Sequence, residues 1–296
     1  MTETRADIFD LGYQRYEGPR EGRMRARQAL WKNGLRTALG LGRGAQAKIL
    51  PVLLFVAVVI PAVAFSFIAS QSGAEFVPGH ADYYQVVSVI LFVFAAIISP
   101  ELLCPDRRDG VISLYLVRPL TTTDYVAGRW LAFFSITLAI VYFGQVILFL
   151  GLMLATGNPV DYILDNWLDI PRFLGAGLVV ALFTTTLPMA VSAFTTRRAY
   201  AAAFVIGLFI VSTAVARALT DDNSVAGDAA KWVALIDLGS VPIHLSDMIF
   251  NHENSSHIAQ LVRELPAVVP VAWYVLLTAG PGFLLWWRYR KMRTET

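Results

Sequence analysis

Long apolar runs, rather than an alternation of apolar and polar positions, dominate this chain. Six runs contain no Asp, Glu, Lys, Arg or His, and each is at least 18 residues long. A helix of about 20 residues crosses a hydrocarbon core of roughly 30 Å and satisfies its own backbone where water is absent. The runs therefore predict six transmembrane helices, over 49–70, 83–100, 130–157, 173–196, 199–216 and 265–287.

The overall composition agrees with this interpretation. Hydrophobic residues make up 56% of the 296 residues and charged residues 16%, whereas soluble chains are about 25% charged. The single cysteine, Cys104, excludes an internal disulfide and a cysteine metal cluster. We therefore expect an all-α integral membrane protein.

Lys and Arg are concentrated in alternate segments between the runs. If the N-terminus is cytoplasmic, the cytoplasmic segments hold 20 of the 24 basic residues, and the outer segments hold 12 of the 22 acidic ones. Basic residues favour the cytoplasmic side of a membrane. This distribution predicts a multi-pass protein of the bacterial cytoplasmic (inner) membrane with both termini inside. Its cytoplasmic segments are 1–48, 101–129, 197–198 and 288–296.

The outer segment 217–264 contains a further apolar stretch, 232–250. This stretch carries Asp237, His244 and Asp247, and it is interrupted from Gly239 to Pro242. A seventh span here would place the basic C-terminal tail outside, which the charge distribution disfavours. We therefore predict short outer helices, either re-entrant or interfacial, between spans five and six.

The chain is expected to divide into three parts: a cytoplasmic tail with an amphipathic helix over 1–48, a transmembrane domain over 49–287, and a cytoplasmic tail over 288–296. Residues 1–22 are expected to lie extended along a cytoplasmic surface. From about residue 24 to 41 the pattern is helical, with a basic stripe beside an apolar one formed by Met24, Trp31, Leu35 and Ala38. This pattern indicates a helix in the inner membrane interface, the alternative being a basic, solvated helix.

Nucleotide-binding and catalytic motifs are missing from the sequence. Segment 42–49 resembles a P-loop, but Ala47 and Ile49 replace the required Gly and Ser or Thr. We therefore expect neither ATP binding nor catalysis by this chain. The predicted outer segments hold four histidines, His80, His244, His252 and His257. Their spacing supports no metal site, so ordinary loop histidines are the simpler interpretation and an external metal site is the alternative.

Mildly polar residues are the only polar groups inside the predicted spans. Ion-coupled transporters usually carry ionisable groups there, so their absence argues against such a transporter. Hydrogen bonds between helices are the simplest role for these groups, and a pathway lining is the alternative. Pro188 predicts a kink, static or hinge-like, with threonine hydroxyls satisfying the freed carbonyl of Thr184. The candidate pathway or hinge residues are Tyr142, Gln145, Thr184, Thr185 and Pro188.

The cytoplasmic segment 101–129 is the most informative part of the sequence. It is long and carries an apolar patch, Val111 to Val117, between charged flanks. Thr122, Thr123 or Asp124 is expected to cap the helix that continues into span three. An exposed apolar patch with a charged rim indicates a docking surface for a cytoplasmic partner.

This segment resembles the first cytoplasmic loop of the permease subunits of ABC-2 type transporters. That loop has an acidic residue, a charged stretch, Gly, a Leu-rich helix, Pro, an acid with an aromatic residue, and Gly-Lys. This chain differs at Arg129, where Lys is commoner. The residues that the resemblance assigns to an ATPase-coupling loop are Glu101, Arg107, Arg108, Gly110, Leu114, Tyr115, Leu116, Arg118, Pro119, Asp124, Tyr125, Gly128 and Arg129.

The resemblance implies a half-transporter that exports an amphipathic or hydrophobic substrate. Its partners would be a second permease subunit, identical or paralogous, a separate ABC ATP-binding subunit and membrane lipid, with no nucleic acid. ATP and Mg²⁺ would bind to the ATP-binding subunit, and this chain would hold no cofactor. The alternatives are a secondary transporter or channel-like protein, and a non-transporting ABC-2-like mechanotransmitter that binds an outer protein through 217–264.

Overall fold

The computed structural model describes residues 18, 22–42, 44–72, 78–117, 120–221 and 229–294. Within these ranges every regular element is a helix, which confirms the predicted all-α class. The predicted extended segment 1–22 lies almost entirely outside them. The helices are α1 (Arg23–Ala38), α2 (Gln46–Ser72), α3 (His80–Arg108), α4 (Ile112–Val117), α5 (Thr122–Ala155), α6 (Pro159–Asp165), α7 (Asp169–Ser192), α8 (Arg198–Thr220), α9 (Ala230–Val233), a 3₁₀ helix (Ala234–Ile236), α10 (Val241–Phe250), α11 (His257–Arg263) and α12 (Val268–Thr294).

Six of these helices, α2, α3, α5, α7, α8 and α12, are long and apolar enough to cross a membrane, as the sequence predicts. Several of these helices extend beyond their apolar runs, most clearly α3 and α5. Helix α3 continues beyond residue 100 to Arg108, and α5 begins at Thr122 rather than at 130. A charged residue at a helix end does not break the helix, so most of segment 101–129 is helical.

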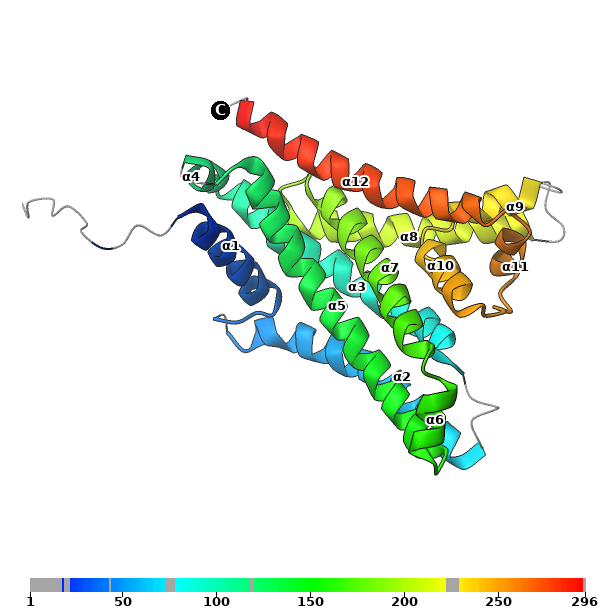
Figure 1. Ribbon diagram of the computed structural model, residues 1–296. Helices are drawn as coiled ribbons and strands as arrows, with labels where there is room; N and C mark the ends of the chain where they lie inside the picture. The colour runs from blue at the N-terminus through cyan, green and yellow to red at the C-terminus, as the bar shows by residue number, and fades with distance from the viewer. Residues whose placement is uncertain are drawn as a thin grey trace, which may run out of the picture.

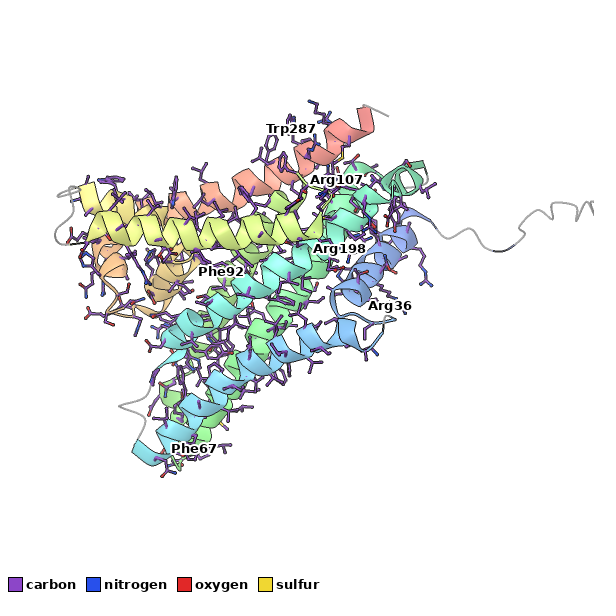
Figure 2. All side chains as sticks on the ribbon, turned by 180° about the vertical axis from the view of Figure 1, so that it is seen from behind. Arg36, Phe67, Phe92, Arg107, Arg198 and Trp287 are labelled. Carbon is purple, nitrogen blue, oxygen red and sulfur yellow. The ribbon has the colours of Figure 1, made fainter. Side chains whose placement is uncertain are left out.

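The helices form two groups that diverge from one end of the molecule (Figure 1). This end, which we call the α4 end, holds α4 and the C-terminal part of α12. From there α5 extends toward α6, at what we call the α6 end, with α2 packed alongside it, and α8 and α12 extend toward α9 and α11. Of the six candidate spans, α3 and α7 are the most enclosed, since 67% of the most apolar stretch of each is buried. Phe92 of α3, labelled in Figure 2, joins the groups, with its ring centroid 4.1 Å from that of Phe209 on α8.

The segment between α8 and α12 contains short helices, as predicted. The part over 230–236 and helix α10 meet at an angle of 110°, at the predicted interruption. Asp237 fixes this bend, because its carboxylate accepts hydrogen bonds from the Thr213 hydroxyl at 2.6 Å and the Gly239 N–H at 3.1 Å. A re-entrant or interfacial position in the membrane remains a prediction.

Helix α6 was not expected from the sequence, which places short outer helices only between spans five and six. Pro159 stands at the start of α6, where its missing N–H costs no hydrogen bond. Two residues earlier, Gly157 has a φ of +69°, a left-handed conformation that ends α5 and that glycine adopts without strain. The seven-residue helix α6 carries Asp161 and Asp165 one turn apart, so its sequence is too short and too polar to be recognised as an apolar run.

Helix α1 forms as predicted, and the face that it buries partly overlaps the predicted stripe. Met24 is 63% exposed, Trp31 and Leu35 are partly buried, and the fully buried positions are Leu30, Gly34 and Ala38. They lie against α5, and a Cβ added at Gly34 would be only 2.6 Å from the Cβ of Ala132. Close contact between small residues therefore contributes to this packing, in addition to the apolar stripe.

Candidate functional site

A reversal of the chain after α3 positions the predicted coupling helix. Gly110 has a φ of +68°, which glycine adopts more readily than other residues. The Val111 N–H donates to the Asp106 carbonyl at 3.1 Å, and the Gly110 N–H donates to the Arg107 carbonyl at 3.4 Å. These bonds form a Schellman motif, so Gly110 ends α3 and turns the chain into α4.

Helix α4 has one side that packs on the protein and one that does not. Ile112 and Tyr115 are partly buried against the main core, and the Tyr115 ring lies 5.7 Å from that of Tyr125 on α5. Leu114 faces away and is 73% exposed. The side chain of Leu116, like residues Arg118 and Pro119, lies outside the described part of the structure.

Asp106, near the end of α3, joins α3 to α5. Its carboxylate accepts hydrogen bonds from the Tyr125 hydroxyl at 2.7 Å and from Arg129 at 2.6 Å. The Arg129 side chain is only 3% exposed, so this ion pair is screened little by solvent. Arg129 therefore holds two spans together in this structure.

Asp124 joins α5 to α1. It forms a capping box with Thr121, whose hydroxyl accepts the Asp124 N–H at 3.3 Å while the Asp124 carboxylate accepts the Thr121 N–H at 2.9 Å. The cap is therefore Thr121, not one of the three residues expected from the sequence. Arg23 and Arg27 donate to the same carboxylate at 2.8 and 2.5 Å.

Two further charged residues join α3 to the turn between α7 and α8 (Figure 2). Glu101 accepts a hydrogen bond from Arg198, the first residue of α8, at 2.5 Å. Arg107 donates to the carbonyls of Ala193 and Thr195, the latter at 3.0 Å. The carbonyls at a helix C-terminus have no partner within the helix, and Arg107 satisfies them here.

The predicted coupling residues thus form two sets. Most of them face inward and bind other helices of the chain, and Gly128 allows Leu30 of α1 to approach closely. Leu114 and Arg108 face outward, and Arg108 pairs with the adjacent Asp109 at 2.9 Å. The sequence did not reveal the partners of the inward-facing residues, which are Arg23, Arg27, Asp106 and Arg198. In the sequence, these partners could have been recognised only as charged residues near the expected helix ends.

The candidate pathway or hinge residues lie within the helix bundle. Tyr142 donates to the Leu174 carbonyl at 2.8 Å, and Gln145 is buried. Thr184 and Thr185 are buried in α7, which is a single helix through Pro188. The Thr184 hydroxyl donates to the Val180 carbonyl at 2.7 Å, one turn back, so it is not engaged with its own freed carbonyl.

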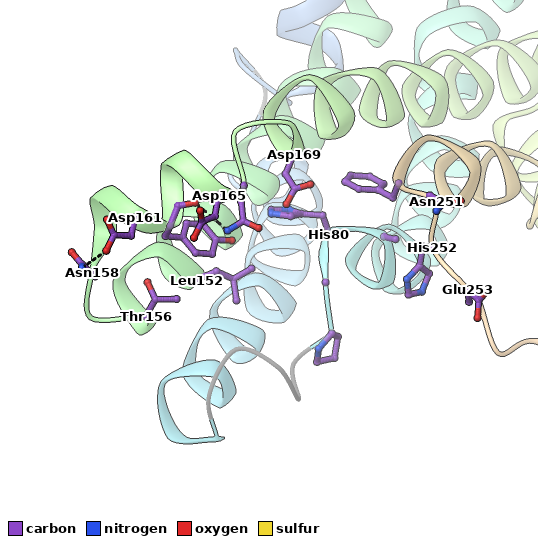
Figure 3. A pocket seen from close by; sticks show the side chains of 16 residues that line it. His80, Leu152, Thr156, Asn158, Asp161, Asp165, Asp169, Asn251, His252 and Glu253 are labelled. Atoms are coloured by element: carbon purple, nitrogen blue, oxygen red, sulfur yellow. Dashed lines mark hydrogen bonds between the residues drawn. The ribbon is translucent and has the colours of Figure 1, made fainter.

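At the α6 end, a cavity of about 670 Å³ lies between α6, the start of α3 and the loop after α10 (Figure 3). Among the described residues, no group of three or more His, Cys, Asp or Glu side chains is placed to hold a metal ion. The residues lining the cavity are Pro78, Gly79, His80, Ala81, Leu152, Thr156, Asn158, Asp161, Tyr162, Asp165, Asn166, Asp169, Phe250, Asn251, His252 and Glu253.

The interpretation of all four histidines as loop residues is wrong for three of them. His80 and His257 begin α3 and α11, and His244 lies within α10. His80 and His244 are also buried, because apolar neighbours on several helices enclose them. Only His252 lies in a loop, where it pairs with Asp82 at 3.1 Å.

A smaller cavity of about 270 Å³ adjoins the first and includes Asp247 of α10. Asp247 is buried and accepts a hydrogen bond from Asn254 at 2.9 Å, and its other oxygen has no partner within the described structure. Burial raises the pKa of Asp247 to about 6, against the lowering effect of the Asn254 bond.

These features define a helical protein with six candidate membrane spans and a short helix held between two of them. The sequence profile of the family described as "ABC-2 family transporter protein" matches residues 50–280, from α2 to α12 and including α4. The match covers most of the chain, so the chain belongs to this family, which confirms the resemblance seen in its loop. Comparison with curated proteins found no match. Permeases of this family are membrane components that work with ABC ATP-binding subunits and are not themselves the ATPase.

Proposed function

We propose that this chain is the transmembrane permease subunit of an ATP-driven exporter in a bacterial cytoplasmic membrane. Two permeases work as a dimer with separate ATP-binding subunits, which hold ATP and Mg²⁺. Residues 1–48 and 288–296 are cytoplasmic, and 49–287 form the transmembrane domain. Family membership and the concentration of basic residues in alternate segments support this arrangement.

The exposure of Leu114 is the observation that carries the proposal. An exposed aliphatic side chain on an apolar helix with charged flanks favours a partner that covers it. The opposite side of α4, with Tyr115, packs on this chain, so α4 presents a fixed surface and not a loose loop. We assign Leu114 to a pocket of the ATP-binding subunit.

The inward-facing residues explain how movement of α4 reaches the spans. The Schellman turn connects α4 to α3, and the Asp106–Arg129 pair connects α3 to α5. Glu101 and Arg107 connect α3 to the turn between α7 and α8. A displacement of α4 by the ATP-binding subunit would therefore move four spans together.

The exported substrate is proposed to be amphipathic or hydrophobic. The polar residues within the spans are uncharged, which suits a substrate without a strongly hydrated group in the membrane. Tyr142, Gln145, Thr184, Thr185 and Pro188 remain the candidates for the pathway or hinge. In the present conformation they are enclosed or half-enclosed, so a pathway along them requires the helices to move.

The test is to purify the permease with its ATP-binding subunit after changing Leu114. Leu114→Asp should abolish co-purification or substrate-stimulated ATP hydrolysis, because a carboxylate would be desolvated without a partner. Leu114→Ala should give a smaller defect in the same direction. Leu41→Asp, a matched change at an exposed leucine away from α4, should leave association intact.

Retention of full stoichiometry and stimulation by Leu114→Asp would show that α4 is not the docking element. Transport without any ATP-binding subunit would favour a secondary transporter or channel-like protein. An outer protein bound at 217–264 with no transported solute would favour a mechanotransmitter.

A further inference from the structure

The cavity at the α6 end presents unpaired negative charge. Asp161 and Asp165 lie one turn apart on α6, and neither has a basic partner among the described residues. The other two acidic residues of the lining, Asp169 and Glu253, are each paired with an arginine 3.2 Å away. Among the described residues, no Lys or Arg lines the cavity. The cavity therefore favours a cationic ligand.

His80 also lines this cavity, although it is only 5% exposed. Gln145 donates its amide to the His80 carbonyl at 3.2 Å, so its Oε1 is the atom that lies 2.6 Å from His80 Nδ1. An oxygen acceptor there requires the proton on Nδ1. In the neutral ring Nε2 is then a bare acceptor, and it has no partner within the described structure.

Aromatic rings surround this acceptor. The His80 ring lies 6.1 Å from that of Phe250 at an interplanar angle of 11°, and Phe250 and Tyr162 both line the cavity. Burial, followed by the nearby Asp169 carboxylate, raises the pKa of Tyr162 to about 12, so its phenol stays neutral. Neutral aromatic faces attract organic cations. Figure 3 shows His80 between the carboxylates of α6 and the loop with Asn251 and His252.

Val160 and Leu164 of α6, and Trp167 just after its end, form an exposed apolar surface. Such a face suits the boundary between membrane and water, where Trp is common. The cavity thus borders both an apolar surface and an aqueous one. A ligand with a charged group and an attached hydrocarbon fits this position.

We propose that this cavity binds the ammonium group of a primary organic amine, supplied by a soluble alkylamine or by the headgroup of an amine-bearing lipid. Asp161 and Asp165 neutralise the charge, Phe250 and Tyr162 cover the carbon atoms, and His80 Nε2 accepts an ammonium N–H. A quaternary ammonium has no N–H and leaves His80 unsatisfied. The site does not depend on the ATP-binding subunit.

Binding is tested by thermal unfolding of the purified full chain in detergent, with hexylamine and hexyltrimethylammonium as probes. Hexylamine should raise the melting temperature saturably, and the trimethyl analogue should bind about tenfold more weakly, since a hydrogen bond to a charged group is lost. The double variant Asp161→Asn/Asp165→Asn changes exposed residues, so it should fold and lose about tenfold in hexylamine affinity. Glu264→Gln removes a charge at an exposed position outside the cavity lining and should bind normally.

A second arm identifies the source of the amine. In nanodiscs, a phosphatidylethanolamine bilayer should stabilise the chain more than a phosphatidylcholine bilayer if the ligand is a lipid headgroup, and the double variant should remove this difference. Hexylamine binding without such a difference assigns the site to soluble amines. Equal affinity for the two probes, or hexylamine binding that the double variant leaves unchanged, would overturn the proposal.

Discussion

The Arg129 guanidinium on α5 lies 2.6 Å from the Asp106 carboxylate on α3, at the base of the helix proposed to meet the ATP-binding subunit. The two residues are 23 positions apart, on either side of α4. Because Arg129 is buried, water replaces its partner poorly, and the pair holds the two ends of the α4 segment together.

Loss of this pair should destabilise the protein strongly. Asp106→Ala leaves a buried guanidinium uncompensated, which costs about 3–5 kcal/mol, and Asp106→Asn should cost less because it keeps an acceptor. Unfolding in detergent measures both changes. Arg108→Ala, at the exposed neighbouring pair, should leave stability almost unchanged. Equal effects at positions 106 and 108 would contradict this role.

The close contact of α1 with α5 gives a second prediction. Gly34→Ala places a methyl group 2.6 Å from the Ala132 Cβ, and it should lower stability by about 1–3 kcal/mol and expose α1 to protease. Adding Ala132→Gly should restore part of this loss. Gly207→Ala, in the open middle of α8, is the matched control and should be neutral or stabilising. The contact is refuted if Gly34→Ala behaves like the control.

Asp247 should make stability depend on pH. Its folded-state pKa of about 6 lies above the ordinary value of 3.8, so folding favours the protonated form. The stability that the protonated Asp247 carboxyl contributes is fully present below about pH 4 and is lost as pH rises through about 6. Asp247→Asn should therefore raise the melting temperature more at pH 8 than at pH 5, with Asp165→Asn as the exposed control. If Asp247→Asn raises the melting temperature more at pH 5 than at pH 8, the predicted pH dependence is wrong.

Membrane topology can be tested by cysteine labelling after Cys104→Ser. An impermeant reagent added outside should label Asp161→Cys and Ser255→Cys, and it should not label Ser113→Cys or Thr196→Cys. All four positions are exposed in the structure. Labelling of Thr294→Cys from outside would mean that segment 232–250 crosses the membrane.

The sequence predicted the spans well because lipid imposes a simple rule on length and polarity. The same rule underestimated the length of the helices, because His80, Asp106 and Asp124 are charged or polar and yet lie within continuous helices. Local pattern was sufficient for the spans. The coupling role that the loop motif assigns to segment 101–129 stays a prediction.

What the sequence could not show depends on contacts between distant residues. The Arg27–Asp124 pair joins positions 97 apart, and no local pattern reports it. The burial of Leu30 and Gly34 of α1 follows from the close approach of α5, which the apolar stripe does not report. The cavity at the α6 end was missed for the same reason, because His80, Asp165 and Phe250 come from three separate helices.

The most direct test of the central claim is photo-cross-linking from position 114 in membranes that contain the whole transporter. A photoreactive amino acid at Leu114 should give a covalent product with an ABC ATP-binding subunit, and the same amino acid at Leu41 should not. A product from position 114 only with lipid or with this chain itself, while the ATP-binding subunit cross-links to other positions, would contradict the assignment of α4 as the coupling helix.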